Sequence, residues 1–133
     1  MRMKRWWPPV ALALVIPLVA AATSALGPTR HLYLEAESPR ADTTLVASPP
    51  AIMLWFSQEP LPNTTEIKLL DASGAVQPVS AVRGDAEDPF HFRADVLGTL
   101  PPGKYQVRWL TWSDDEPGGF LRDGSFTFSV KAP

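Results

Sequence analysis

The sequence contains no cysteine, and this absence removes several classes of protein at once. Disulfide frameworks, zinc–thiolate centres and cysteine nucleophiles all require a thiol. Histidine and methionine are also scarce, with two and three residues among 133. Two of the methionines lie in the first three residues, and Met53 lies in an apolar run that predicts a core position. We therefore expect no thioether-rich site, and any metal site must use histidine, carboxylate or backbone ligands.

Long apolar runs are also missing, except near the N-terminus. Three basic side chains within residues 2–5 precede the apolar run Val10–Ala22, and small residues follow as far as Ala25. This order predicts a secretory signal peptide over residues 1–25, cleaved after Ala25 or, as the alternative, after Ala22. The run is short for a membrane-spanning helix, which needs about 20 residues. The two tryptophans before it could extend it, so an uncleaved anchor is the second interpretation.

The chain has no excess of basic residues. Removal of the predicted signal would take three of the twelve basic residues and none of the fourteen acidic ones, leaving a net charge of about −5. That balance argues against nucleic acid as a partner, because its binding depends on Lys and Arg contacts to phosphate. The sequence also has no triad-like nucleophile signature and no glycine-rich phosphate loop. We expect a binding protein rather than an enzyme, and the acidic surface is compatible with cation binding.

No segment shows sustained helical periodicity, and the apolar residues alternate instead with a period of two. Turn signals, including the Asp71–Gly74 turn, separate these segments at roughly ten-residue intervals. The expected loops are an acidic one over Gly84–Pro89 and a polar, glycine-rich one over Asp114–Asp123. Ala51–Phe56 is almost entirely apolar, which predicts a strand covered on both faces. About seven to eight short strands predict one all-β domain over residues 31–131, an antiparallel β-sandwich. The expected strands are 31–37, 43–47, 51–56, 65–70, 75–82, 90–96, 104–113 and 124–131.

Five different short motifs follow one another along this domain. They are His31-Leu-Tyr-Leu34 with Ser38-Pro39 and Thr44-Leu45, Pro49-Pro50 with Ile52–Ser57 and Glu59-Pro60, the Asp71–Gly74 turn, Leu100–Trp109, and Gly124–Val130. In this combination the chain resembles the CopC family of periplasmic copper-binding proteins. The resemblance implies an immunoglobulin-like or cupredoxin-like sandwich in the periplasm that carries or buffers Cu(II) in copper homeostasis or resistance. Its implied partners are the copper ion and an inner-membrane copper transporter, and it would contact the membrane only through an uncleaved signal segment.

The resemblance also implies a set of metal ligands. In that family an N-terminal histidine binds Cu(II) through its imidazole and α-amine, and an Asp and a second His follow the long tryptophan strand in a Ser-x-Asp-x-His motif. His31 matches the first ligand and Asp115 matches the aspartate, but Pro117 stands at the position of the second histidine. Cleavage after Ala25 would also leave residues 26–30 ahead of His31. We therefore expect a copper site altered from the family pattern.

Three further side chains are candidate substitutes for the missing ligand: Asp114, Glu116 and His91. Each also has an ordinary interpretation, as part of a solvated acidic loop or as a surface-facing strand histidine. A different class of function remains open, in which the sandwich binds no metal and acts as a protein-interaction or scaffolding module. Trp112 and Phe120, expected to be exposed beside the acidic loop, would suit such a contact surface. Sugar binding by the same two aromatic residues is a third alternative.

Overall fold

The structure is a computed structural model that describes residues 31–114 and 119–132. The predicted signal peptide (residues 1–25) lies outside these ranges and stays a prediction, as does its alternative as an anchor. The described residues fold entirely as β-structure, and they include no helix that could cross a membrane. The all-β prediction is confirmed. The strands are β1 (Leu34–Ser38), β2 (Thr44–Leu45), β3 (Ala51–Phe56), β4 (Glu66–Asp71), β5 (Val76–Gln77), β6 (Arg83–Asp85), β7 (Asp88–Asp95), β8 (Gly103–Ser113) and β9 (Phe120–Val130).

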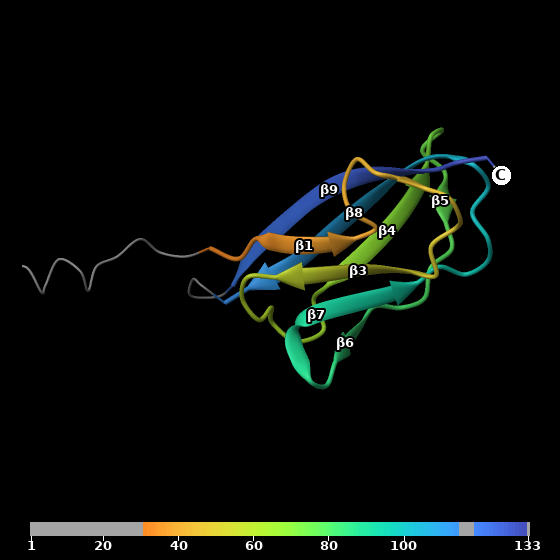
Figure 1. Cartoon of the computed structure of the whole chain (residues 1–133). Helices are drawn as coiled ribbons and strands as arrows, with labels where there is room; N and C mark the ends of the chain where they lie inside the picture. Colours follow the sequence, from red (N-terminus) through yellow and green to blue (C-terminus); the bar gives the residue numbers. More distant parts are fainter. Residues whose placement is uncertain (1–30, 115–118, 133) are drawn as a thin grey trace, which may run out of the picture.

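The strands form two sheets that pack face to face as a sandwich (Figure 1). The first sheet has the order β1-β3-β7-β6, and the second has the order β2-β9-β8-β4-β5. Among the described strands every pair is antiparallel except β2 with β9. The longest ladder joins β8 and β9 without a bulge, from Gly103 opposite Val130 to Ser113 opposite Phe120. This ladder lies within the second sheet, with β2 on one side and β4 on the other.

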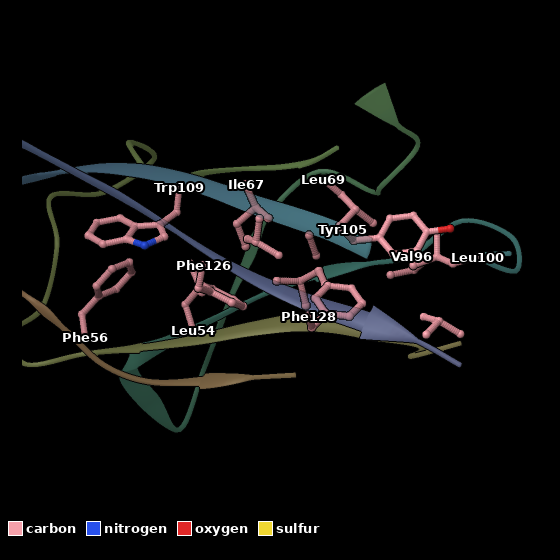
Figure 2. Packing of buried hydrophobic residues seen from close by; sticks show 14 of the residues in the cluster. Leu54, Phe56, Ile67, Leu69, Val96, Leu100, Tyr105, Trp109, Phe126 and Phe128 are labelled. Carbon is pink, nitrogen blue, oxygen red and sulfur yellow. The ribbon is translucent and has the colours of Figure 1, made fainter. Parts of the chain in front are cut away.

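The core lies between the sheets and follows from the period-two pattern of the central strands. Ile52, Leu54 and Phe56 of β3 point inward with at most 1 % exposure. Figure 2 shows the ring of Phe56 beneath the indole of Trp109, with their centroids 5.3 Å apart in an edge-on arrangement. Buried side chains from both sheets complete this cluster: Leu32, Ile67, Leu69, Ala94, Val96, Leu100, Tyr105, Val107, Phe126, Phe128 and Val130. The strands expected over residues 104–113 and 124–131 thus supply buried side chains to this core.

The prediction that β3 is covered on both faces is wrong. Met53 and Trp55 alternate with the buried residues and lie half-buried on the outer face of the first sheet. Met53 is therefore not a core residue. A side chain of the neighbouring strand β7 covers Trp55 on this outer face. This cover allows an apolar residue there, so the run is nearly all apolar.

Both expected loops contain strand residues. The acidic segment predicted as a loop over Gly84–Pro89 forms a tight hairpin, with β6 and β7 paired as close as Asp85 opposite Asp88. The second sheet extends further than expected as well, because β9 begins at Phe120 and not at Gly124. In both places the backbone pairs with a neighbouring strand although the side chains carry no apolar alternation. β6 is the additional strand, so nine strands form where seven to eight were expected.

Candidate functional site

His31 lies at the end of the sandwich where β8 ends and β9 begins. It precedes β1 of the first sheet, yet its imidazole contacts the second sheet. Nη2 of Arg122, on β9, lies 2.7 Å from Nδ1 of His31. Figure 1 shows that the described chain begins at the same end, beside the start of β9. The first predicted ligand therefore bridges the two sheets at this end.

The β8–β9 ladder positions Arg122. Arg122 pairs with Thr111 of β8, whose hydroxyl is fully buried and 2.7 Å from the hydroxyl of Thr65. The guanidinium of Arg122 also stacks on the ring of Phe120, with Cζ 4.1 Å from the ring centroid. Because a guanidinium can only donate hydrogen bonds, Nδ1 of His31 is the acceptor in this contact.

Sequence reasoning missed Arg122. It lies 91 residues from His31 and in a segment that was expected to be a polar loop. Nothing in the local pattern indicates that the two side chains meet. The signal that would find this contact is the pairing register of β8 and β9, which places Arg122 two positions inside the ladder.

The predicted acidic ligands lie around the β8–β9 connection. Asp114 follows β8 directly and is exposed. Asp115, Glu116 and Pro117 lie outside the described residues, so their roles remain predictions. Within residues 31–114 and 119–132, no three His, Cys, Asp or Glu side chains gather closely enough to hold a metal ion. The described residues alone therefore do not supply a complete Cu(II) ligand set.

His91 lies in a different environment, on the outer face of the first sheet. Its ring is stacked on the indole of Trp55, with centroids 4.4 Å apart and planes within 2° of parallel. Its Nδ1 is 3.4 Å from Oδ2 of Asp85. The backbone N–H of Glu87 and then the imidazole of His91 lower the pKa of the Asp85 carboxyl. His91 is thus held by β3 and β6 of the first sheet, whereas His31 contacts the second sheet.

The His91 side chain is 16 % exposed, so it is more covered than the expected surface-facing histidine. Its Nε2 is buried, and the described residues provide no hydrogen-bond partner for it. His91 and His31 thus have different partners, which are Trp55 and Asp85 for His91 and Arg122 for His31.

The exposed aromatic residues at the same end divide between two faces. Trp112 and Phe120 are 39 % and 41 % exposed, as expected. Trp112 is paired with Leu121, and directly paired residues share one face of a sheet. Phe120 precedes Leu121 on β9, so it lies on the opposite face of the sheet. Arg122 shares that face, and its guanidinium stacks on the ring of Phe120. The two aromatic residues therefore do not form a single contact surface.

Comparisons with known proteins agree with this architecture. The CopC domain family matches residues 34–131, a range that begins just after His31. Protein YobA of Escherichia coli K12 is 28 % identical over 123 residues, which are 91 % of this chain and 97 % of YobA. The crystal structure of CopC from Methylosinus trichosporium OB3b aligns with a TM-score of 0.69 and 28 % identity, covering 77 % of this chain and 95 % of that one. PcoC, described as a methionine-rich copper resistance protein from Escherichia coli, aligns with a TM-score of 0.66 and 29 % identity over 77 % of this chain and all of that one.

Proposed function

The chain belongs to the CopC family, and from this premise we propose that it is an exported copper-binding protein that carries or buffers Cu(II) in copper resistance or homeostasis. The observation that carries the proposal is the family match over residues 34–131. The likeness to the copper resistance protein PcoC, which extends over the whole of PcoC, agrees with it. The position of His31 supports it, because its partner Arg122 lies near the start of β9, and Asp114 directly follows the end of β8 paired with it. In this proposal copper is the cargo, and the protein acts by binding and not by catalysis.

We assign the copper ligands to His31 and Asp115, with Asp114 and Glu116 as the adjacent oxygen donors. Cu(II) favours tetragonal sets of nitrogen and oxygen ligands, and these side chains supply that chemistry. Only one nitrogen donor is assigned from a side chain, so the site is weaker than one with two histidines. Such a site exchanges copper readily, which suits a carrier or a buffer.

The proposal does not include a Cu(I)–thioether site. PcoC is described as methionine-rich, whereas this chain has three methionines. Among the described residues only Met53 is a methionine, and it lies half-buried on the outer face of β3. A soft Cu(I) ion needs several thioether ligands in one place.

The proposed location is the periplasm, reached through the predicted signal peptide over residues 1–25. An inner-membrane copper transporter is the proposed recipient of the cargo. If the signal segment stays attached, the domain would be tethered to the cytoplasmic membrane. Mass spectrometry of the protein isolated from the periplasmic and membrane fractions decides between these forms, and it also establishes whether residues 26–30 precede His31.

Cu(II) titration of the exported protein tests the copper-binding proposal. We expect one copper ion per chain, and at least a tenfold weaker affinity for His31→Ala and for Asp115→Asn. His91→Ala is the matched histidine control and should bind copper like the wild type. Absence of binding by the wild-type protein at micromolar Cu(II) would contradict a carrier role.

A metal-free interaction module is the second candidate function. One observation favours it: the Nδ1 nitrogen of His31 is already hydrogen-bonded to Arg122. The exposed pair Trp112 and Leu121 would then provide the contact surface. Titration separates the two candidates, because the interaction module predicts no copper binding by the wild type or by His31→Ala.

A further inference from the structure

We propose that Arg122 sets the copper affinity of this chain by occupying the Nδ1 nitrogen of His31, so that the metal must compete with a guanidinium for this ligand. The inference rests on the proposed copper-binding function and deepens it. Arg122 lies outside the five motifs that carry the family resemblance. Its basis is the contact between Nη2 of Arg122 and Nδ1 of His31, at 2.7 Å.

The contact uses the electron pair that a metal would need. A guanidinium has no acceptor atom, so the hydrogen bond to Nδ1 engages the ring lone pair. The other ring nitrogen then carries the proton in the neutral imidazole. A copper ion can bind His31 only if it displaces Arg122 from Nδ1 or replaces the proton on Nε2. Either route makes binding less favourable than at an uncommitted imidazole.

Arg122 is held in place for this contact. It lies on β9 inside the continuous β8–β9 ladder, opposite the fully buried Thr111. The ring of Phe120 supports the guanidinium from one side, at 4.1 Å. A side chain fixed in this way loses little conformational freedom when it bonds to His31, so the contact is more persistent than an ordinary surface hydrogen bond.

Charge acts in the same direction as the hydrogen bond. The guanidinium carries a positive charge. A divalent cation bound at His31 would therefore lie beside a permanent positive charge, and the repulsion weakens binding further. If only a fraction of molecules have Arg122 displaced, the apparent affinity is reduced by that fraction. The result is a site that loads at high copper concentration and releases the ion easily.

Two substitutions separate the hydrogen bond from the charge. Arg122→Ala removes both, and we expect it to tighten Cu(II) binding by about tenfold, since a hydrogen bond to a charged group typically changes an equilibrium constant by that factor or more. Arg122→Gln removes the charge but keeps a donor, and it should lie between Ala and the wild type. The matched control is Arg40→Gln, because Arg40 is exposed just beyond the opposite end of β1. We expect it to bind copper within twofold of the wild type.

A second readout needs no metal. The nitrogen-15 chemical shift of His31 Nδ1, measured in the copper-free protein, reports whether a donor is bound there. We expect it to move towards the value of an unbonded imidazole in Arg122→Ala and to stay unchanged in Arg40→Gln. Circular dichroism and the thermal midpoint identify any variant that fails to fold. If Arg122→Ala does not fold, Arg122→Gln provides the test instead.

The outcomes distinguish this inference from the copper-binding proposal. If the wild type binds Cu(II) and both Arg122 variants bind equally well or more weakly, Arg122 does not compete with copper, and the inference fails while the carrier role stands. If the wild type does not bind at micromolar Cu(II) but Arg122→Ala does, the inference is supported and the carrier role fails. If neither binds at micromolar Cu(II), the copper-binding proposal and the inference both fail.

Discussion

The indole of Trp109 lies directly over Gly124, the residue paired with it on β9. A Cβ atom at position 124 would lie 2.7 Å from Cζ2 of the indole and 2.9 Å from Cε2. The indole also packs edge-on with the ring of Phe56, with centroids 5.3 Å apart. Gly124 therefore allows β9 to approach the core, and Arg122 stands two residues earlier on the same strand. The packing of Trp109 thus supports the strand that carries the contact to His31.

Gly124→Ala should destabilise the domain by about 1–3 kcal/mol, the usual cost of adding a methyl group to a well-packed core. The free energy of unfolding from urea denaturation measures this effect. Gly84→Ala is the control, since a Cβ there would lie 3.5 Å from Cε1 of Phe92, an ordinary contact. We expect Gly84→Ala to change stability by less than about 0.5 kcal/mol. Equal losses in the two variants would contradict the packing argument.

Asp95 makes the stability depend on pH. Hydrogen bonds from Arg83 and Arg93, both at 2.9 Å, lower the pKa of its carboxyl from 3.8 to about 2. A carboxyl whose pKa is lower in the folded state stabilises the fold above the unfolded pKa. This stabilisation is present above pH 3.8 and is lost as the pH falls through about 2.

We expect Asp95→Asn to unfold at a lower temperature than the wild type at pH 6, and the difference in thermal midpoint to disappear near pH 2. The side chains of Arg83 and Asp95 are 54 % and 34 % exposed, so 1 M salt should also shrink the difference at pH 6. A difference that persisted unchanged down to pH 2 would show that the substitution acts through packing and not through charge.

Tyr105 connects the core to the turn that precedes β8. Its hydroxyl donates a hydrogen bond to the carbonyl of Pro101, and burial raises the pKa of the phenol. Tyr105→Phe should cost about 1 kcal/mol in the free energy of unfolding, because it removes the hydrogen bond but preserves the ring that stacks on Phe128. Urea denaturation measures the change, and Tyr105→Leu should cost more because it also removes the stacked ring. If Tyr105→Phe left the free energy of unfolding unchanged, the hydroxyl would have no stabilising role.

The sequence was sufficient for the fold wherever a strand buries one face. Ile52, Leu54 and Phe56 alternate with half-buried residues, and the same alternation marks β8 and the second half of β9. Burial produces this pattern, so the pattern predicts the strands and their inward faces. The Asp71–Gly74 turn was predictable for a local reason as well, because Oδ1 of Asp71 accepts hydrogen bonds from the backbone N–H groups of Ser73 and Ala75.

The rest was not predictable from local pattern. β6 is an exposed strand at the edge of its sheet, so its residues carry no apolar alternation although the backbone pairs with β7. The first residues of β9 are strand because β8 continues opposite them. The candidate site divides in the same way. His31 could be singled out from a motif, whereas Arg122 meets it only through the closure of two sheets.

His91 provides the last prediction, because its surroundings indicate a structural role. The imidazole is stacked on Trp55, and its Nε2 is buried. His91→Ala should lower the free energy of unfolding by roughly 0.5–1.5 kcal/mol, the range for aromatic stacking, while Cu(II) affinity stays within twofold of the wild type. His31→Ala should instead weaken copper binding at least tenfold, and the loss of its hydrogen bond to Arg122 should also lower the free energy of unfolding by about 0.5–1.5 kcal/mol. Urea denaturation and Cu(II) titration of both variants make this comparison. A loss of copper affinity in His91→Ala comparable to that in His31→Ala would instead identify His91 as a ligand.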